Sequence, residues 1–202
     1  MRNLEARKSQ NKKSKNWLIA LIIVVILVAT GIVLFLTQST RISAELGQAK
    51  AQYTIGLEYY QKKNYTKAQP WLVKASNQKN ADAENTLGVM YLNGLGVKKD
   101  VQKAKDLFQP SAERGNKFAA EHLGTLYYFG QGVTKDYSIA VKWLKISSDA
   151  GMANSQNLLG TMYLYGKGVA KNKQQAIELY HKAAAQGNSY AQNNLKKLGI
   201  KS

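Results

Sequence analysis

Hydrophobic residues are arranged in two different ways along this 202-residue chain. Near the N-terminus, residues 17–36 read WLIALIIVVILVATGIVLFL, a run of twenty residues without a charge. As an α-helix rising about 1.5 Å per residue, this run is roughly 30 Å long, which matches the hydrocarbon thickness of a bilayer. Lipid offers the backbone no hydrogen-bond partners, so a helix is required even for a run rich in Val and Ile. The pattern predicts one transmembrane helix over residues 17–37.

The charges that flank the apolar run predict its orientation. Residues 1–16 carry six Lys or Arg and one Glu, whereas the only basic residues among the twenty after Leu36 are Arg41 and Lys50. Positive charge is retained on the cytoplasmic side. We therefore expect 1–16 to be a cytoplasmic tail, 38–50 a linker, and the rest to lie outside the cytoplasm at an inner or plasma membrane. A cleaved signal peptide, whose apolar region is usually shorter (about 7–15 residues), and a buried core helix are the alternatives.

Beyond the apolar run, the hydrophobic pattern repeats with a period of 36 residues. A fixed period of this length is typical of repeat architectures. The stretch YLNGLGVKKD returns as YYFGQGVTKD and YLYGKGVAKN. The recurring columns are Leu87, Leu123 and Leu159; Gly88, Gly124 and Gly160; Tyr91, Tyr127 and Tyr163; Gly94, Gly130 and Gly166; Gly96, Gly132 and Gly168; Val97, Val133 and Val169; Asp100, Asp136 and Asn172; Ala104, Ala140 and Ala176; and Gly115, Gly151 and Gly187.

Each repeat is predicted to be a pair of helices. From Ala83 to Tyr91 the apolar residues fall at i, i+4, i+7 and i+8, which is one face of a helix. Gly94 then ends this helix, Asp100 is a favoured N-cap for a second one, and Gly115 suits the position after its end. A single hairpin cannot bury its apolar face, but stacked hairpins can. The predicted fold class is therefore all-α, an α-solenoid.

The paired glycines admit a second interpretation. A dinucleotide-type glycine loop follows a strand and opens a helix, whereas these glycines follow a helix and no strand pattern occurs downstream of residue 37. We therefore interpret them as turns between helices. A nest of backbone N–H groups beside Lys98, Lys99, Lys135 or Lys171 that holds an anion is the alternative.

The repeat pattern resembles a known family. Residues 83–118, 119–154 and 155–190 follow A-x-x-x-L-G-x-x-Y-x-x-G-x-G-V-x-x-D-x-x-x-A, and they resemble the Sel-1-like repeat (SLR), a relative of the tetratricopeptide repeat. Residues 51–82 look like a divergent unit that lacks the G-x-G-V turn, and 191–202 like a C-terminal cap. The solenoid is thus expected over 51–202. Pro70 and Pro110 fall within second helices, which they are expected to bend or shorten.

The resemblance implies a partner-binding surface. In such solenoids the first helices line the concave side, and their positions that do not pack inward contact the partner. Aromatic and amide side chains suit capture of a protein or peptide. Packing of these rings between neighbouring units is the alternative interpretation. The implied positions are Tyr53, Leu57, Tyr60 and Gln61; Asn85, Val89, Leu92 and Asn93; Glu121, Thr125, Tyr128 and Phe129; and Asn157, Thr161, Leu164 and Tyr165.

Composition narrows the possible partners. The chain has no cysteine, which excludes disulfides, thiol nucleophiles and lipid-modified cysteine. Its net charge is +17, and residues 38–202 retain 23 Lys or Arg against 11 Asp or Glu. Outside the cytoplasm nucleic acid is not an expected partner, whereas anionic lipid headgroups or cell-wall polymers are. A solvated basic surface is the alternative. The lysines expected on the turns and second helices are Lys98, Lys99, Lys103, Lys105, Lys142, Lys145, Lys171, Lys173 and Lys182.

The residues for catalysis are few. His122 and His181 occupy different repeat positions, so no metal site, cofactor or acid–base pair is expected. Because some SLR proteins have been linked with β-lactams, S-x-x-K was sought; Ser9 to Lys12 and Ser76 to Lys79 fit it, but no S-D-N or K-T-G accompanies them. We therefore expect a non-catalytic adaptor or scaffold. An anionic polymer or lipid-binding module and a β-lactam hydrolase are the alternatives.

Overall fold

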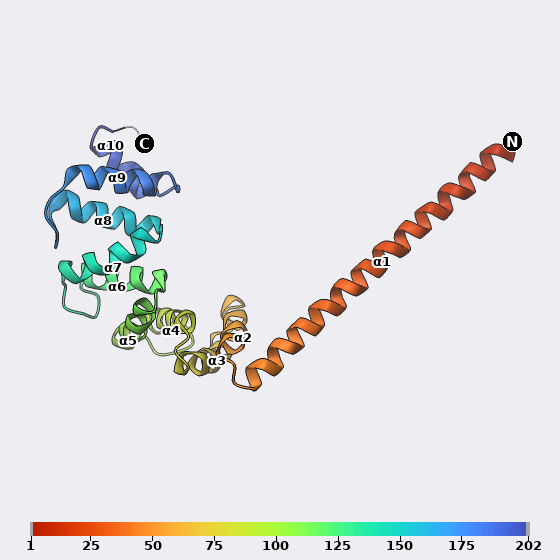
Figure 1. The fold of residues 1–202 in the computed structure, drawn as a ribbon, viewed down its shortest axis with the longest axis horizontal. Coiled ribbons are helices and arrows are strands. Elements are labelled where there is room, and N and C mark those ends of the chain that lie inside the picture. Colours follow the sequence, from red (N-terminus) through yellow and green to blue (C-terminus); the bar gives the residue numbers. More distant parts are fainter. Residues whose placement is uncertain (1, 201–202) are drawn as a thin grey trace.

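The computed structural model describes the backbone of residues 2–200 and the side chains of residues 22 and 25–200. Every regular element in this part of the chain is a helix, and the paired helices stack along an arc, with a long single helix projecting from one end (Figure 1). An all-α solenoid is therefore confirmed. The helices are α1 (Arg2–Glu45), α2 (Ala49–Gln61), α3 (Tyr65–Asn77), α4 (Ala81–Asn93), α5 (Val101–Glu113), α6 (Lys117–Phe129), α7 (Tyr137–Asp149), α8 (Ala153–Tyr165), α9 (Lys173–Ala184) and α10 (Ser189–Lys197).

The long helix α1 differs from the expected tail, helix and linker. It runs without a break to Glu45, so only residues 46–48 separate it from α2, in place of a linker over 38–50. The reason is local: nothing between residues 38 and 46 breaks a helix, and the chain first turns at Gly47, whose φ is +87°. Side chains of the basic tail 1–16 lie outside the described residues.

Within α1, the described side chains of the apolar run face solvent. Ile22, Val25 and Leu34 are each more than half exposed. The segment Val25–Glu45 is long and apolar enough to cross a membrane. At its C-terminal end the helix packs on the first hairpin, because Ala44 is buried with Ala51 and Ile55 of α2. The helix is therefore exposed at the described positions of its apolar run and attached to the solenoid at one end.

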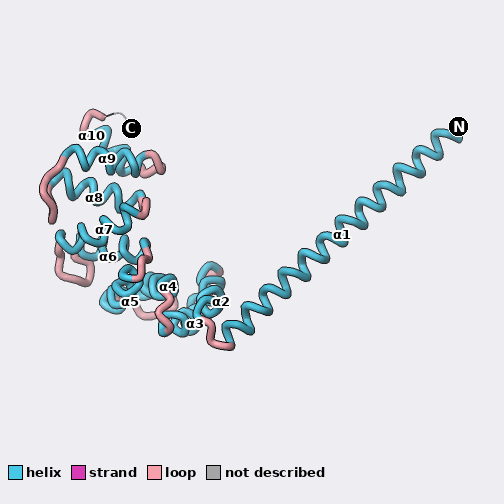
Figure 2. The backbone as a smooth tube through the Cα atoms, viewed as in Figure 1, coloured by secondary structure: helices cyan, strands magenta, loops and turns pink. Residues whose placement is uncertain are grey.

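The hairpins are capped at the positions that the repeat pattern predicts. The side chains of Asp100, Asp136 and Asn172 accept hydrogen bonds from backbone N–H groups at the starts of α5, α7 and α9. Gly94, which follows α4, is left-handed with φ +72°. The longer loops after α4, α6 and α8, which carry the paired glycines, can be followed in Figure 2. These glycines are turns, as expected.

The second glycine of each pair has an additional role that the sequence did not indicate. It brings the loop against the preceding unit. A Cβ at Gly96 would lie 2.5 Å from the Cβ of Tyr65, at the start of α3, and one at Gly132 would lie 2.5 Å from a methyl of Val101, at the start of α5. The G-x-G turn is therefore a contact between units as well as a turn within one.

The core is formed by first and second helices that cross closely. A Cβ at Gly124 would lie 2.5 Å from the Leu144 side chain, so glycine is what lets α6 and α7 approach. Ala104, Ala140 and Ala176 on the second helices are fully buried. The buried clusters follow one another along the solenoid, and the last packs α10 on α9 through Ala191 and Leu195. Helix α10 thus covers the end of the core, within a segment predicted to be a cap over 191–202.

The two prolines do not shorten their helices. Pro70 lies in α3 and Pro110 in α5, and both helices have 13 residues, as do α4 and α6. The predicted shortening is therefore not found, and the alternative, that the prolines bend these helices, stays a prediction. Each proline lies well past the first turn, where it removes one hydrogen bond, but packing of the second helix on its neighbours maintains the remainder.

Candidate partner-binding surface

The predicted surface residues lie on the four first helices α2, α4, α6 and α8. Exposure divides them into two groups. Phe129 and Tyr165 are 53% and 65% exposed, respectively, and the polar Gln61 and Asn93 are also exposed, whereas the other twelve positions are half-buried. Two exposed aromatic residues at equivalent positions of consecutive units are the largest free apolar groups in the predicted set. They occupy the C-terminal residue of α6 and of α8.

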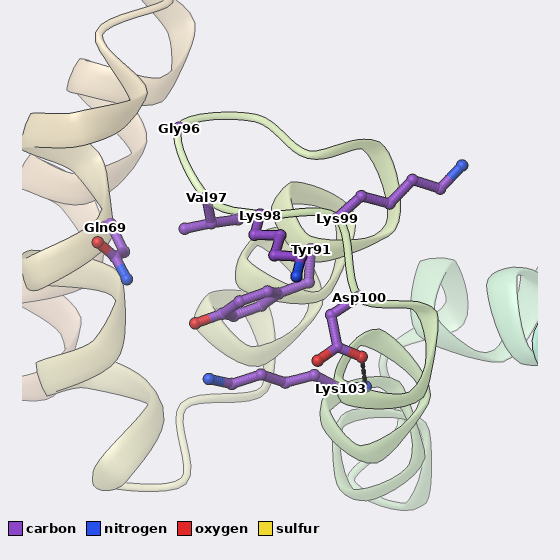
Figure 3. Close-up of a pocket in the computed structure, with 8 residues that line it drawn as sticks. All are labelled: Gln69, Tyr91, Gly96, Val97, Lys98, Lys99, Asp100 and Lys103. Atoms are coloured by element: carbon purple, nitrogen blue, oxygen red, sulfur yellow. Dashed lines mark hydrogen bonds between the residues drawn. The ribbon is translucent and has the colours of Figure 1, made fainter.

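The opposite side of the first helices faces the second helices. Tyr91 of α4 is buried between Gln69 of α3 and Lys103 of α5, which line one cavity with it (Figure 3). At 100° per residue, Val89 and Asn93 lie about 160° around α4 from Tyr91. The predicted set is thus on the side of α4 that points away from the second helices. We call this side of α2, α4, α6 and α8 the first-helix surface.

An aromatic cluster forms where α6 and α8 end. The ring of Tyr128 lies 4.8 Å from that of Phe129 in a T-shaped arrangement and 5.4 Å from that of Tyr137. Lys167 reaches this cluster from the loop after α8. Its Nζ donates to the Tyr128 hydroxyl at 3.2 Å and lies over the rings of Tyr128 and Tyr137 at 5.1 and 5.4 Å. We call Tyr128, Phe129, Tyr137, Tyr165 and Lys167 the aromatic cluster.

The charge of Lys167 is stabilised by its surroundings. The hydrogen bond to Tyr128 raises the pKa of Lys167, and the nearby phenols of Tyr137 and Tyr165 raise it further. The ammonium is therefore a fixed positive charge at the edge of an exposed apolar surface. Such a surface can pack against an apolar side chain and at the same time attract an acidic group or a carbonyl oxygen.

Lys167 and Tyr137 were missed by sequence reasoning. The residue between the paired glycines is Leu95, Gln131 or Lys167, so a charge in the third copy is visible in the repeat alignment. Its contact with the preceding unit is not, because the two residues it joins are 39 positions apart. Tyr137 is the first residue of α7, a position that the family pattern does not assign to the first-helix surface.

Most polar candidates are engaged in hydrogen bonds, two of them with a neighbouring unit or the cap. Glu121 accepts hydrogen bonds from Ser155 at 3.0 Å and Asn154 at 3.4 Å, and Asn157 accepts one from Asn194 at 2.9 Å. The Thr161 hydroxyl is 3.1 Å from the Tyr180 hydroxyl, and the Thr125 hydroxyl donates to a backbone carbonyl of its own helix. In Asn85 the buried Oδ1 has no partner among the described residues.

The remaining apolar candidates pack largely between units. Tyr53, Tyr60, Val89 and Leu92 contact the first buried cluster, and Leu164 contacts the last one. Burial raises the pKa of the Tyr53 hydroxyl, which faces Thr86 and Asp82 of the next unit. Leu57 is half-buried on α2. These residues shape the surface and hold the stack together, and they leave the aromatic cluster as its most accessible part.

The histidines do not form a site together. His122 stacks on Phe108 at 4.7 Å between ring centroids, and burial lowers its pKa. His181 is exposed on α9. Among the described residues, no group of three or more His, Asp or Glu side chains is placed to hold a metal ion.

The repeat pattern matches an established family model. Copies of the Sel1 repeat match residues 45–80, 81–116, 118–152 and 153–188, which is well over half of the chain. The chain belongs to the Sel1 repeat family. Repeats of this family mediate protein–protein interactions. The matched units begin slightly before the predicted ones, in agreement with the observed starts of α4 and α8.

Solved structures show the same fold. A protective antigen of uropathogenic Escherichia coli strains that displays an SLR fold superposes with a TM-score of 0.74 and 36% identity, over 79% of this chain and 35% of that one. A Sel1 repeat protein from Oxalobacter formigenes gives 0.72 and 32%, over 80% and 68%. Cysteine-rich protein B of Helicobacter pylori gives 0.50 and 26%, over 64% and 92%.

One curated protein matches a single stretch. The ERAD-associated E3 ubiquitin-protein ligase component HRD3B of Arabidopsis thaliana is 49% identical over 41 residues, which is 20% of this chain and 7% of the plant protein. This Sel1 repeat chain thus spans about a third of the E. coli antigen and a small part of the plant protein.

Proposed function

We propose that this Sel1 repeat protein is a membrane-anchored, non-catalytic adaptor that holds a protein or peptide partner on its first-helix surface. The observation that carries the proposal is the aromatic cluster: Phe129 and Tyr165 are more than half exposed, Phe129 packs on Tyr128, and Lys167 donates a hydrogen bond to that same tyrosine. Exposed aromatic residues of this kind dominate the binding energy of many interfaces. The family assignment supports a protein partner.

The chemistry of the cluster defines the class of partner. Burying each exposed ring contributes about 1.5–3 kcal/mol, which favours an apolar partner side chain. The ammonium of Lys167 favours an acidic side chain or a terminal carboxylate next to it. We therefore propose as partner a segment of a cell-envelope protein in which an apolar and an acidic residue are adjacent.

Photo-crosslinking tests partner capture in cells. A photoreactive residue at Tyr165 is expected to form a discrete adduct, and Phe129→Ala in the same chain is expected to reduce that adduct by about tenfold, the effect of one interface anchor. Tyr190, which is 72% exposed on α10 outside the cluster, is the matched control position. The proposal fails if the same adduct forms from Tyr190 or persists when Phe129 is removed.

The membrane anchor is a separate part of the proposal. We propose that α1 crosses the inner or plasma membrane, with residues 1–16 in the cytoplasm and the solenoid outside it. The exposed apolar side chains of α1 and the positive charge before residue 17 support this arrangement. We fuse to the C-terminus a reporter that works only outside the cytoplasm, and we expect it to be active. We also expect the chain to remain in the membrane fraction after a high-salt wash. Activity of a cytoplasm-specific reporter instead would overturn the orientation.

A second candidate function is binding of an anionic envelope polymer or lipid headgroup through the second helices and loops. Eight of the nine lysines expected there are exposed, and Lys105 is half-buried. Binding of this kind falls steeply as salt rises, whereas partner capture by the aromatic cluster does not. The hydrolase alternative predicts turnover of a chromogenic β-lactam by the purified protein, and we expect none.

A further inference from the structure

The side of α4 opposite the first-helix surface carries a cavity of about 690 Å³ at the junction of two consecutive units. Gln69 of α3 forms one wall, and Tyr91 of α4 lies opposite it (Figure 3). Lys98, from the loop after α4, lies on one side of the Tyr91 ring, and Lys103 of α5 extends along the other side. Lys99 belongs to the same loop but points away from Gln69.

The groups that face this cavity are mainly hydrogen-bond donors. They comprise two ammonium groups, the Tyr91 hydroxyl and the Gln69 amide. The Nζ of Lys103 is 4.3 Å from the centre of the Tyr91 ring, and the interaction with this tyrosine raises the pKa of Lys103. The lysine is exposed, and its ammonium lies over the ring as a cation.

The acidic residue at the cavity is already occupied. Asp100 caps α5, and its Oδ1 accepts a hydrogen bond from the backbone N–H of Lys103 at 2.9 Å. Neither Lys98 nor Lys103 takes part in an ion pair among the described side chains. The cavity thus has two cations and one carboxylate, and the charge of Asp100 raises the pKa of Lys103 without forming an ion pair with it.

The fold itself does not require these lysines. The repeat provides an internal comparison, because Tyr91 recurs as Tyr127 and Tyr163 in the other two complete units. At the position of Lys98 those units have Thr134 and Ala170, and at the position of Lys103 they have Ile139 and Gln175. The tyrosine belongs to the repeat, whereas the pair of lysines is particular to the unit of residues 81–116.

We propose that this cavity binds a phosphate group carried by an envelope component. Lysine binds phosphate as a point charge, and two ammonium groups with a phenol and an amide offer donors to several oxygens of one phosphate. The volume lies within the range of small-ligand sites and exceeds what a bare phosphate needs, so it leaves room for the glycerol or sugar to which the phosphate is attached. The inference deepens the second candidate function and rests on it, and it is independent of partner capture by the aromatic cluster.

Calorimetric titration of the full chain in zwitterionic lipid nanodiscs tests the site. Inorganic phosphate, glycerol 3-phosphate and vesicles containing phosphatidylglycerol serve as three separate probes. At least one probe is expected to bind, and the one that binds most tightly distinguishes free phosphate, a soluble phosphoglycerol unit and a lipid headgroup as the source. If no probe binds, the inference is wrong, whereas the second candidate function is tested separately by the salt dependence of binding to an anionic polymer.

Paired substitutions separate the cavity from the general charge of the surface. The variant Lys98→Thr with Lys103→Gln introduces residues that sister units carry, so it is expected to fold and to bind at least tenfold more weakly. The control Lys135→Gln with Lys171→Gln removes the same charge from exposed positions in the loops after α6 and α8 and is expected to change affinity less than twofold. Equal losses in the two variants would overturn the inference while leaving a basic-surface function intact.

Discussion

At the scale of single residues, one pair of equivalent positions joins the two helices of each unit. The side chains at this pair of positions differ from unit to unit. In the first unit the Gln78 amide donates to Gln52 at 2.8 Å, and in the last unit Gln186 donates to Gln156 at the same distance. The unit of residues 81–116 uses an ion pair between Glu84 and Arg114 at these positions. The next unit has alanine at both, Ala120 and Ala150. One structural position thus tolerates an amide pair, an ion pair or two methyl groups.

The ion pair leads to a prediction about stability. Glu84 is 7% exposed and its second oxygen has no partner, so Arg114→Ala leaves a buried carboxylate unpaired. We expect a loss of about 2–3 kcal/mol, less than for a fully buried pair because Arg114 is one-third exposed. Adding Glu84→Ala reproduces the alanine pair of the next unit and is expected to restore most of that loss. Urea denaturation measures both, and a double variant no more stable than Arg114→Ala would refute the explanation.

At the scale of the elements, the G-x-G loop connects a unit to the one before it. Gly168 has φ +68°, and a Cβ there would overlap the backbone of Tyr137 and Ser138 at the start of α7. Gly187 is also left-handed, with φ +83°, but a Cβ at that position would meet nothing within 4 Å. The two glycines have the same backbone requirement and differ in whether another unit lies against them. Substitutions at these two glycines therefore distinguish the free-energy cost of a left-handed backbone from the cost of steric overlap with another unit.

This difference predicts two distinct outcomes for the same substitution. Gly187→Ala is expected to cost about 1 kcal/mol, the penalty of a left-handed conformation alone. Gly168→Ala is expected to cost about 2–4 kcal/mol, because the backbone of α7 cannot move aside as a flexible side chain would. Thermal unfolding of both variants provides the measurement. Similar losses for the two would show that the loop contact between units adds no stability.

At the scale of the whole molecule, each unit depends on its neighbours. The chain forms a row of helical pairs (Figure 1), buried clusters follow one another along it, and α10 packs on the last pair. Stability in such a solenoid is approximately a sum of local terms along the row. Damage at the cap is therefore expected to remain near the cap, far from α1 and α2.

The cap prediction uses Leu195, which is fully buried against α9. Leu195→Ala is expected to cost about 2–4 kcal/mol through lost contacts and a residual cavity. Hydrogen exchange is expected to show faster opening of α8, α9 and α10 while α2 and α3 remain unchanged. Tyr190→Ala, an exposed position on the same helix, is the control and should change stability by less than about 0.5 kcal/mol. Equal acceleration in every unit would mean that the solenoid unfolds as one body.

The sequence by itself determined the repeat and its caps. The 36-residue period, the aspartate and asparagine N-caps and the glycine turns depend on residues close along the chain, so local rules suffice to predict them. The continuation of α1 through residues 38–45 is also predictable from local rules, because that stretch contains neither glycine nor proline.

Only the tertiary structure decided which surface residues are free. Glu121, Asn157 and Thr161 follow the pattern of the first-helix surface as well as Phe129 does, yet they are engaged by residues of neighbouring units or helices. Two other contacts likewise join residues far apart in sequence. Lys167 donates to Tyr128, and one cavity is lined by Gln69, Tyr91 and Lys103. The physical reason is that exposure and charge pairing depend on how one hairpin stacks on the next, and periodicity within a hairpin carries no information about that contact.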